Sequence, residues 1–129
     1  MEKPFVLVID DNRQTADSLV EMLTMLEYPC KASYGPRGAM EYVTQRFPGL
    51  VFIDIHMPGV DGLEVCRHLR RDPRTVHVPI IIISSDQQPD LVRRAYEAGA
   101  NHFLLKPLTL DILEQTLTTA LKGQVEHDQ

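Results

Sequence analysis

The stretch LVFIDIHMPGVDGL, residues 50–63, decides the fold of this chain. Its first four residues are all apolar, which is typical of a strand that is covered on both faces in a parallel sheet. Asp54 follows where this buried strand becomes a loop, the Pro-Gly pair at 58–59 predicts a turn, and the Asp-Gly pair at 61–62 predicts the start of a helix. An isolated aspartate at such a position usually caps a helix or closes a turn. The role of Asp54 therefore depends on what the rest of the chain brings to the same place.

Length and composition are those of one globular domain, because 129 residues with 43% hydrophobic and 24% charged side chains can bury a substantial core. The net charge of -5 argues against a nucleic-acid-binding face, and the basic run at 67–74 is interpreted as a solvated helix end. Cys30 and Cys66 lie far apart without metal-ligand spacing, so we expect neither a zinc site nor a disulfide. The apolar run near the N-terminus is too short for a signal peptide or a membrane span, so we expect a cytoplasmic protein with no membrane partner.

Strand-like segments alternate with helical segments along the whole chain. The predicted strands are the apolar runs 5–9, 50–54 and 80–83, the alternating edge segment 30–34, and the short segment 101–105. Apolar residues at helical spacing predict helices from Arg13 to Tyr28-Pro29, from Gly35-Pro36 to about Phe47, from 61–62 onward, through Leu91 to a C-cap at Gly99, and after an N-cap at Thr109. This order predicts an α/β domain with a parallel sheet and helices on both faces over residues 1–122, followed by a polar tail or the start of a linker at 123–129.

Each predicted strand except the second has a polar residue at its C-terminal end. These residues are Asp10 and Asp11, Asp54, Ser84 and Lys106. Parallel strands end at one edge of a sheet, so we expect these side chains to lie together. Carboxylates that lie close together repel each other and have raised pKa values unless a cation binds between them. Oxygen ligands without a competing set of histidines or cysteines suit Mg²⁺ better than zinc. The sequence therefore predicts a magnesium site that takes a phosphoryl group.

The residue types at this edge suggest the chemistry. An ionised Asp54 can attack phosphorus and form an acyl phosphate if the negative charges are offset. Magnesium held by Asp11 and Asp54 would offset part of the charge, and the Lys106 ammonium would pair with a phosphoryl oxygen from the other side. The Ser84 hydroxyl can donate to a third oxygen.

Four segments resemble response-regulator receiver domains of the two-component (histidine-to-aspartate phosphorelay) family: VLVIDDN at 6–12, DIHMPGVDGLE at 54–64, PIIIISS at 79–85 and HFLLKPL at 102–108. The resemblance covers about residues 4–122. It implies a flavodoxin-like fold, a doubly wound five-stranded parallel sheet with strand order 2-1-3-4-5.

The resemblance also implies roles for the site residues. Asp54 would be the phosphoacceptor, Asp11 a direct magnesium ligand, and Asp10 a second acid that holds the metal through water. The backbone carbonyl of His56 would complete the protein's share of the coordination.

The remaining implied roles concern the switch. Ser84 and Lys106 would contact the phosphoryl group, with a cis bond before Pro107. Phe103 lies where the family carries its switching aromatic ring. Phosphorylation would then change the surface formed by the fourth helix, fifth strand and fifth helix, through which the domain would control a downstream protein or output domain or form a phosphorylation-dependent dimer. The donor would be a sensor histidine kinase or a histidine phosphotransfer protein.

Two other functions stay open. One is a haloacid-dehalogenase-like phosphohydrolase with an aspartyl-phosphate intermediate, although such enzymes need an acid two residues after the nucleophile and this chain has His56 there. The other is a receiver that binds partners constitutively. The sequence also leaves open whether the extra hydroxyl of Ser85 adds a contact, and how His56 and Asp86 affect the lifetime of the acyl phosphate. Likewise, Arg93 and Arg94 beside Leu91 and Val92 form either a docking surface or a solvated helix face.

Overall fold

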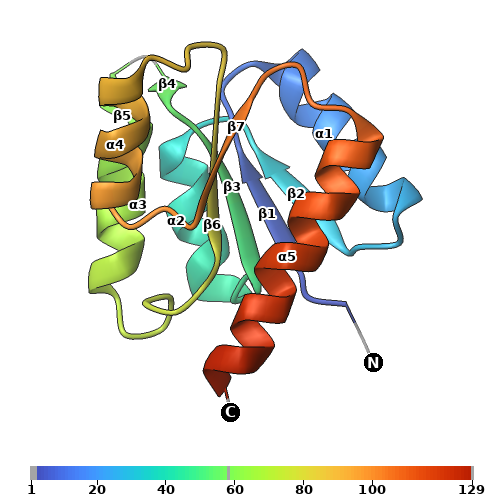
Figure 1. Cartoon of the computed structure of the whole chain (residues 1–129). Helices are drawn as coiled ribbons and strands as arrows, with labels where there is room; N and C mark the ends of the chain where they lie inside the picture. Colours follow the sequence, from blue (N-terminus) through green and yellow to red (C-terminus); the bar gives the residue numbers. More distant parts are fainter. Residues whose placement is uncertain (1–2, 58, 129) are drawn as a thin grey trace.

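The apolar runs of the sequence form one buried parallel sheet at the centre of the domain (Figure 1). The computed structural model describes residues 3–57 and 59–128, with the side chains of 44, 60 and 123–128 left outside the description. The sheet has five strands in the order β2-β1-β3-β6-β7, and every neighbouring pair is parallel. Its strands are β1 (Val6–Ile9), β2 (Cys30–Ser33), β3 (Leu50–Asp54), β6 (Ile80–Ser84) and β7 (His102–Leu105). The predicted order of the sheet is confirmed.

A small hairpin between β3 and the next helix was not predicted. Its strands β4 (His56–Met57) and β5 (Val60–Asp61) pair antiparallel, His56 opposite Asp61. The sequence predicted only a turn here, because two-residue strands are too short to show alternation.

Five helices cover the two faces of the sheet: α1 (Arg13–Met25), α2 (Pro36–Gln45), α3 (Gly62–Arg71), α4 (Pro89–Glu97) and α5 (Leu110–Asp128). Successive strand residues point to opposite faces. Leu7 and Ile9 therefore join a core cluster that contains residues of α2, α3 and α4, whereas Val6 and Val8 join a cluster that contains residues of α1 and α5. The domain thus has three layers, with α1 and α5 on one side of the sheet and α2 to α4 on the other (Figure 1).

Two helices end earlier than predicted. Helix α1 stops at Met25 rather than at Tyr28-Pro29, because Glu27 adopts a left-handed conformation with φ 67°. The backbone N–H groups of Glu27 and Tyr28 then donate to the carbonyls of Thr24 and Leu23, the pattern of a Schellman C-cap. Helix α2 stops at Gln45, so that Phe47 lies outside the helix and is 55% exposed.

The last helix is longer than predicted, since α5 continues to Asp128 through the segment expected to be a tail. The division of the chain at residue 122 stays a prediction. The Thr109 hydroxyl accepts a hydrogen bond from the Ile112 backbone N–H at 3.2 Å, so the predicted N-cap is confirmed. Among the described residues, none of the helices combines the length and apolar character that a membrane span requires.

Candidate functional site

The three aspartates predicted to share a site do lie together at the C-terminal edge of the sheet. Ile9, just before Asp10, pairs with Ile53, just before Asp54, so the ends of β1 and β3 are level. One carboxylate oxygen each from Asp10, Asp11 and Asp54 lies within 4.8 Å of the other two. Asp10 and Asp54 are buried, and Asp11 lies closer to the solvent.

Lys106 joins the two buried acids. Its ammonium nitrogen lies 3.0 Å from an oxygen of Asp10 and 3.1 Å from an oxygen of Asp54. The backbone N–H of Lys106 donates to the Ser84 carbonyl at 2.7 Å, which fixes the end of β7 against β6. The bond between Lys106 and Pro107 is cis, as the resemblance implied.

The electrostatics of this cluster oppose a charged Asp54. Burial raises the pKa of the Asp54 carboxyl, and the neighbouring Asp10 raises it further, while the Lys106 ammonium only partly offsets both effects. For Lys106, burial alone would lower the pKa, but hydrogen bonds and charge attraction from Asp10 and Asp54 outweigh burial and raise it. The lysine therefore stays cationic, and the acids still gain from an additional cation.

Ser84 lies on the strand beside Asp54. Asp54 pairs with Ile83, so Ser84 is one residue further along β6, and its side chain is fully buried. Its hydroxyl accepts a hydrogen bond from the Asp86 backbone N–H at 3.0 Å. Asp86 in turn accepts from the Gln88 backbone N–H at 3.0 Å, whereas Ser85 is exposed. The turn after β6 thus holds the Ser84 hydroxyl at the edge where the acids lie.

Two residues for which no role at the site was predicted, Asn12 and Gly62, position the acids. The Asn12 side chain caps α1 by accepting from the Thr15 backbone N–H, and the Asn12 backbone N–H donates to Asp10 at 3.0 Å. Gly62 lets the first turn of α3 approach the strand, since a Cβ there would lie 2.3 Å from the Asp54 carbonyl oxygen. An Asn just before the helical pattern is an N-cap signal that could have been read from the sequence. The tight contact at Gly62 depends on tertiary packing and left no such signal.

The side chains of two further predicted residues, His56 and Phe103, lie apart from the acid cluster. His56 is exposed on β4 and lines a pocket between the hairpin and α4. Phe103 is half-buried on β7 and packs against the core cluster beneath α3 and α4. The roles of the His56 carbonyl and of the Phe103 ring stay predictions.

The acid cluster can bind a metal ion. Three carboxylates supply hard oxygen ligands, and none of the described histidines or cysteines belongs to the cluster. Buried acids that are only partly compensated by one lysine also fit a divalent cation, because such a cation relieves their mutual repulsion.

Comparison with known proteins agrees with this geometry. The family model described as the response regulator receiver domain matches residues 6–118. The phosphate regulon transcriptional regulatory protein PhoB of Pseudomonas aeruginosa is 29% identical over 117 residues, which are 91% of this chain and 51% of PhoB. The response regulator PleD of Caulobacter vibrioides is 34% identical over 104 residues, which are 80% of this chain and 23% of PleD. The chain spans about half the length of these curated relatives or less.

Solved structures show the same fold. The CheY-like receiver domain protein from Methanospirillum hungatei superposes with a TM-score of 0.89 at 19% identity, covering 98% of this chain and 99% of that one. The chain belongs to the response regulator receiver domain family, the phosphoacceptor domains of two-component signal transduction.

Proposed function

We propose that this chain takes a phosphoryl group onto Asp54 and that residues 1–122 form the unit that does so. The observation that supports the proposal most directly is the contact of the Lys106 ammonium with both Asp10 and Asp54, at 3.0 and 3.1 Å. In that arrangement, the buried Asp54 carboxylate lies beside the Lys106 ammonium at the C-terminal edge of the sheet. A phosphoryl group bound there would meet the nucleophile on one side and the ammonium on the other.

The proposed transfer starts from a phosphohistidine of a sensor kinase or a phosphotransfer protein. A carboxylate oxygen of Asp54 forms the new P–O bond, and the P–N bond to the donor histidine breaks. The leaving imidazole nitrogen keeps the bonding electron pair and takes up a proton. Lys106 and Ser84 each bind one of the phosphoryl oxygens.

Mg²⁺ is the metal that suits this site best. Asp11 and Asp54 would hold it directly, Asp10 through water, and the His56 backbone carbonyl would supply a further oxygen. When bound, Mg²⁺ would neutralise charge on the acids and on the phosphoryl oxygens. The only reactions that we propose for the chain are its own phosphorylation and dephosphorylation.

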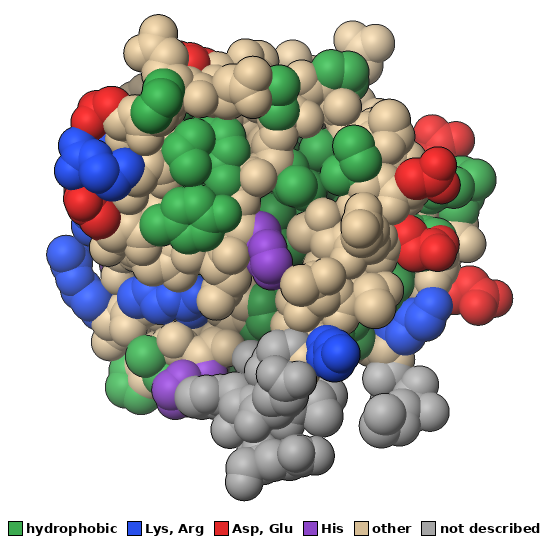
Figure 2. Space-filling model, viewed as in Figure 1, with side chains coloured by type: hydrophobic (Ala, Val, Ile, Leu, Met, Phe, Trp, Pro, Cys, Tyr) green, Lys and Arg blue, Asp and Glu red, His purple; other side chains and the backbone are tan. Residues whose placement is uncertain are grey.

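The proposed output surface is the face formed by α4, β7 and α5. Figure 2 shows apolar side chains spread over this face, and Tyr96 on α4, Leu105 on β7 and Ile112 on α5 are 48%, 39% and 43% exposed. Inward movement of the half-buried Phe103 ring would alter this face, because Phe103 lies on β7. The face would then bind a downstream protein, an output domain or a second receiver. The cytoplasmic location expected from the sequence stays a prediction.

Intact-mass measurement tests the proposal. With Mg²⁺ and phosphoramidate in excess, the wild-type chain should gain the mass of one phosphoryl group, and Asp54→Asn should gain none. Asp61→Asn is the matched control, because Asp61 caps α3 outside the acid cluster and asparagine caps equally well. A wild-type chain that gains no mass would refute the proposal.

The same material separates the two alternatives. Repeated turnover of a phosphomonoester would favour a phosphohydrolase, but no contact in the described part of the chain favours that function over the receiver. A partner that binds the phosphorylated and unmodified chains equally well would favour constitutive binding.

A further inference from the structure

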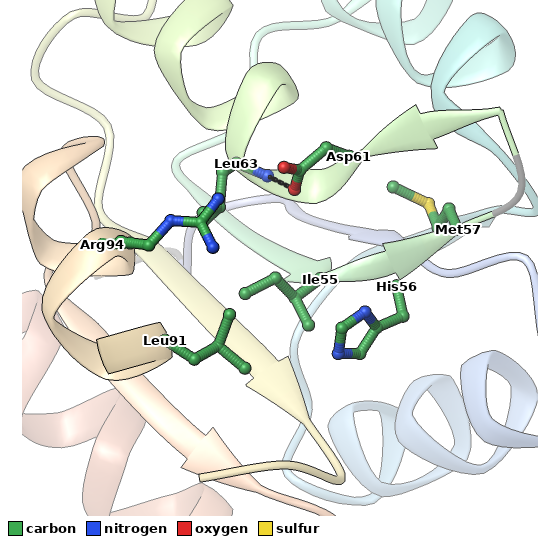
Figure 3. A pocket seen from close by; sticks show the side chains of 7 residues that line it. All are labelled: Ile55, His56, Met57, Asp61, Leu63, Leu91 and Arg94. Atoms are coloured by element: carbon green, nitrogen blue, oxygen red, sulfur yellow. Dashed lines mark hydrogen bonds between the residues drawn. The ribbon is translucent and has the colours of Figure 1, made fainter. Parts of the chain in front are cut away.

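A pocket of about 530 Å³ opens between the β4–β5 hairpin, the start of α3 and one side of α4 (Figure 3). Its lining residues are Ile55, His56, Met57, Asp61, Leu63, Leu91 and Arg94. None of the lining residues is Asp10, Asp11, Asp54, Ser84 or Lys106, and the pocket faces α3 and the hairpin, whereas the proposed output surface includes β7 and α5. Pockets of this size usually hold a small molecule or a few residues of a peptide.

The floor of the pocket is apolar. Ile55, Met57 and Leu63 are between 1% and 7% exposed and belong to the core cluster, and the partly buried Leu91 packs against it. Figure 3 shows Leu91 and Ile55 projecting into the same space. An aliphatic side chain entering the pocket would therefore contact carbon atoms on several sides and lose its exposure to water.

The rim of the pocket carries a cation, Arg94, for which the described residues provide no salt-bridge partner. The neighbouring Arg93 forms salt bridges with both Asp90 and Glu97 on α4. Arg94 forms no salt bridge with any described residue, and its guanidinium extends over the pocket toward the start of α3 (Figure 3). Asp61 also lines the pocket and caps α3, where one of its carboxylate oxygens accepts from the Leu63 backbone N–H at 2.8 Å.

From these features we infer that the pocket binds a peptide segment of a partner protein in which leucine-like side chains lie beside a carboxylate. The aliphatic side chains would fill the apolar floor, and the carboxylate would pair with the Arg94 guanidinium, which offers a planar pair of donors. This inference does not require that Asp54 accept a phosphoryl group.

The tripeptide acetyl-Leu-Leu-Glu-amide is a suitable probe, followed by NMR titration of the whole chain. We expect shifts confined to residues 55–57, 61–63 and 91–94, with a dissociation constant on the order of millimolar. The Arg94→Gln substitution should weaken binding about 5-fold, the worth of roughly 1 kcal/mol for an exposed charge pair. The neutral probe acetyl-Leu-Leu-Gln-amide should bind the wild-type chain more weakly than the acidic probe does, by the same factor.

Arg71→Gln is the control, since it removes an exposed arginine of α3 that does not line the pocket. It should leave the affinity unchanged. The inference is wrong if the tripeptide shifts none of these residues, if Arg71→Gln weakens binding as much as Arg94→Gln, or if inorganic phosphate alone reproduces the shifts at the same concentration. None of these outcomes bears on the mass gain that tests Asp54.

Discussion

Replacing Asp54 with asparagine should make the metal-free protein more stable, although it removes the proposed phosphoacceptor. Asp54 is 5% exposed, and a carboxylate oxygen of Asp10 lies within 4.8 Å of one of its own. At an effective dielectric constant of 20, two charges 4.8 Å apart repel by about 3.5 kcal/mol, which is therefore the least that Asp10 costs, whereas the Lys106 ammonium at 3.1 Å attracts by about 5 kcal/mol. Burying the charge costs several kcal/mol more, so a net penalty of about 1–2 kcal/mol remains.

The direction of the pKa shift fixes how this penalty depends on pH. The pKa of Asp54 is raised in the folded protein, first by burial and then by Asp10. A protonated Asp54 carries no penalty, so the wild type and the variant should be equally stable below the unfolded pKa of about 3.9. As the pH rises through the folded pKa, the wild-type chain alone loses stability. The variant should then be more stable by about 1–2 kcal/mol at pH 8.

Urea denaturation with EDTA at pH 4.5 and pH 8 measures the difference. Adding Mg²⁺ to the wild type at ten times its dissociation constant should restore about 1.4 kcal/mol, and the variant should gain much less because it has lost one ligand charge. If the variant is not more stable at pH 8, or if the difference does not widen between the two pH values, the assignment of Asp54 as a buried and disfavoured charge is wrong.

Three further substitutions test features of the fold around the site. Arg70→Met should lower the free energy of unfolding, measured by urea denaturation, by about 2–4 kcal/mol. The reason is that the Arg70 guanidinium donates hydrogen bonds to backbone carbonyls of the 75–78 segment and of Gly99, and to the side chain of Asn101. The control Arg71→Met, at an exposed neighbour, should lower it by less than about 0.5 kcal/mol. Gly62→Ala should lower both stability and the rate of phosphorylation by phosphoramidate, because the new Cβ would press on the Asp54 carbonyl, while the new Cβ of Gly35→Ala would meet no atom within 4 Å and should leave the rate of phosphorylation unchanged. Thr109→Ala should cost about 1 kcal/mol in thermal unfolding, and an unchanged melting temperature would contradict its capping role.

Local patterns in the sequence predicted the parallel sheet and the gathering of the acids, whereas the strand order was implied only by the resemblance to receiver domains. Apolar runs that end in polar residues can be recognised in the sequence itself, and a parallel sheet brings those ends to one edge. The hydrogen bonds of Arg70 were not predicted, since its partners lie up to 31 positions away, and a basic helix end resembles a solvated one. The end of α1 was missed because Glu27, and not a glycine, takes the left-handed conformation.

The short hairpin after Asp54 is fixed at its base on both sides. The Ile55 backbone N–H donates to the Ile83 carbonyl, and the Ile55 carbonyl accepts from the Gly62 N–H, each at 3.1 Å. Both ends of the hairpin are therefore held by Ile55, the residue that follows Asp54. Residues could therefore be added at the outer turn of the hairpin without displacing the Asp54 carboxylate, so this chain should tolerate a longer hairpin while its acid cluster keeps its geometry.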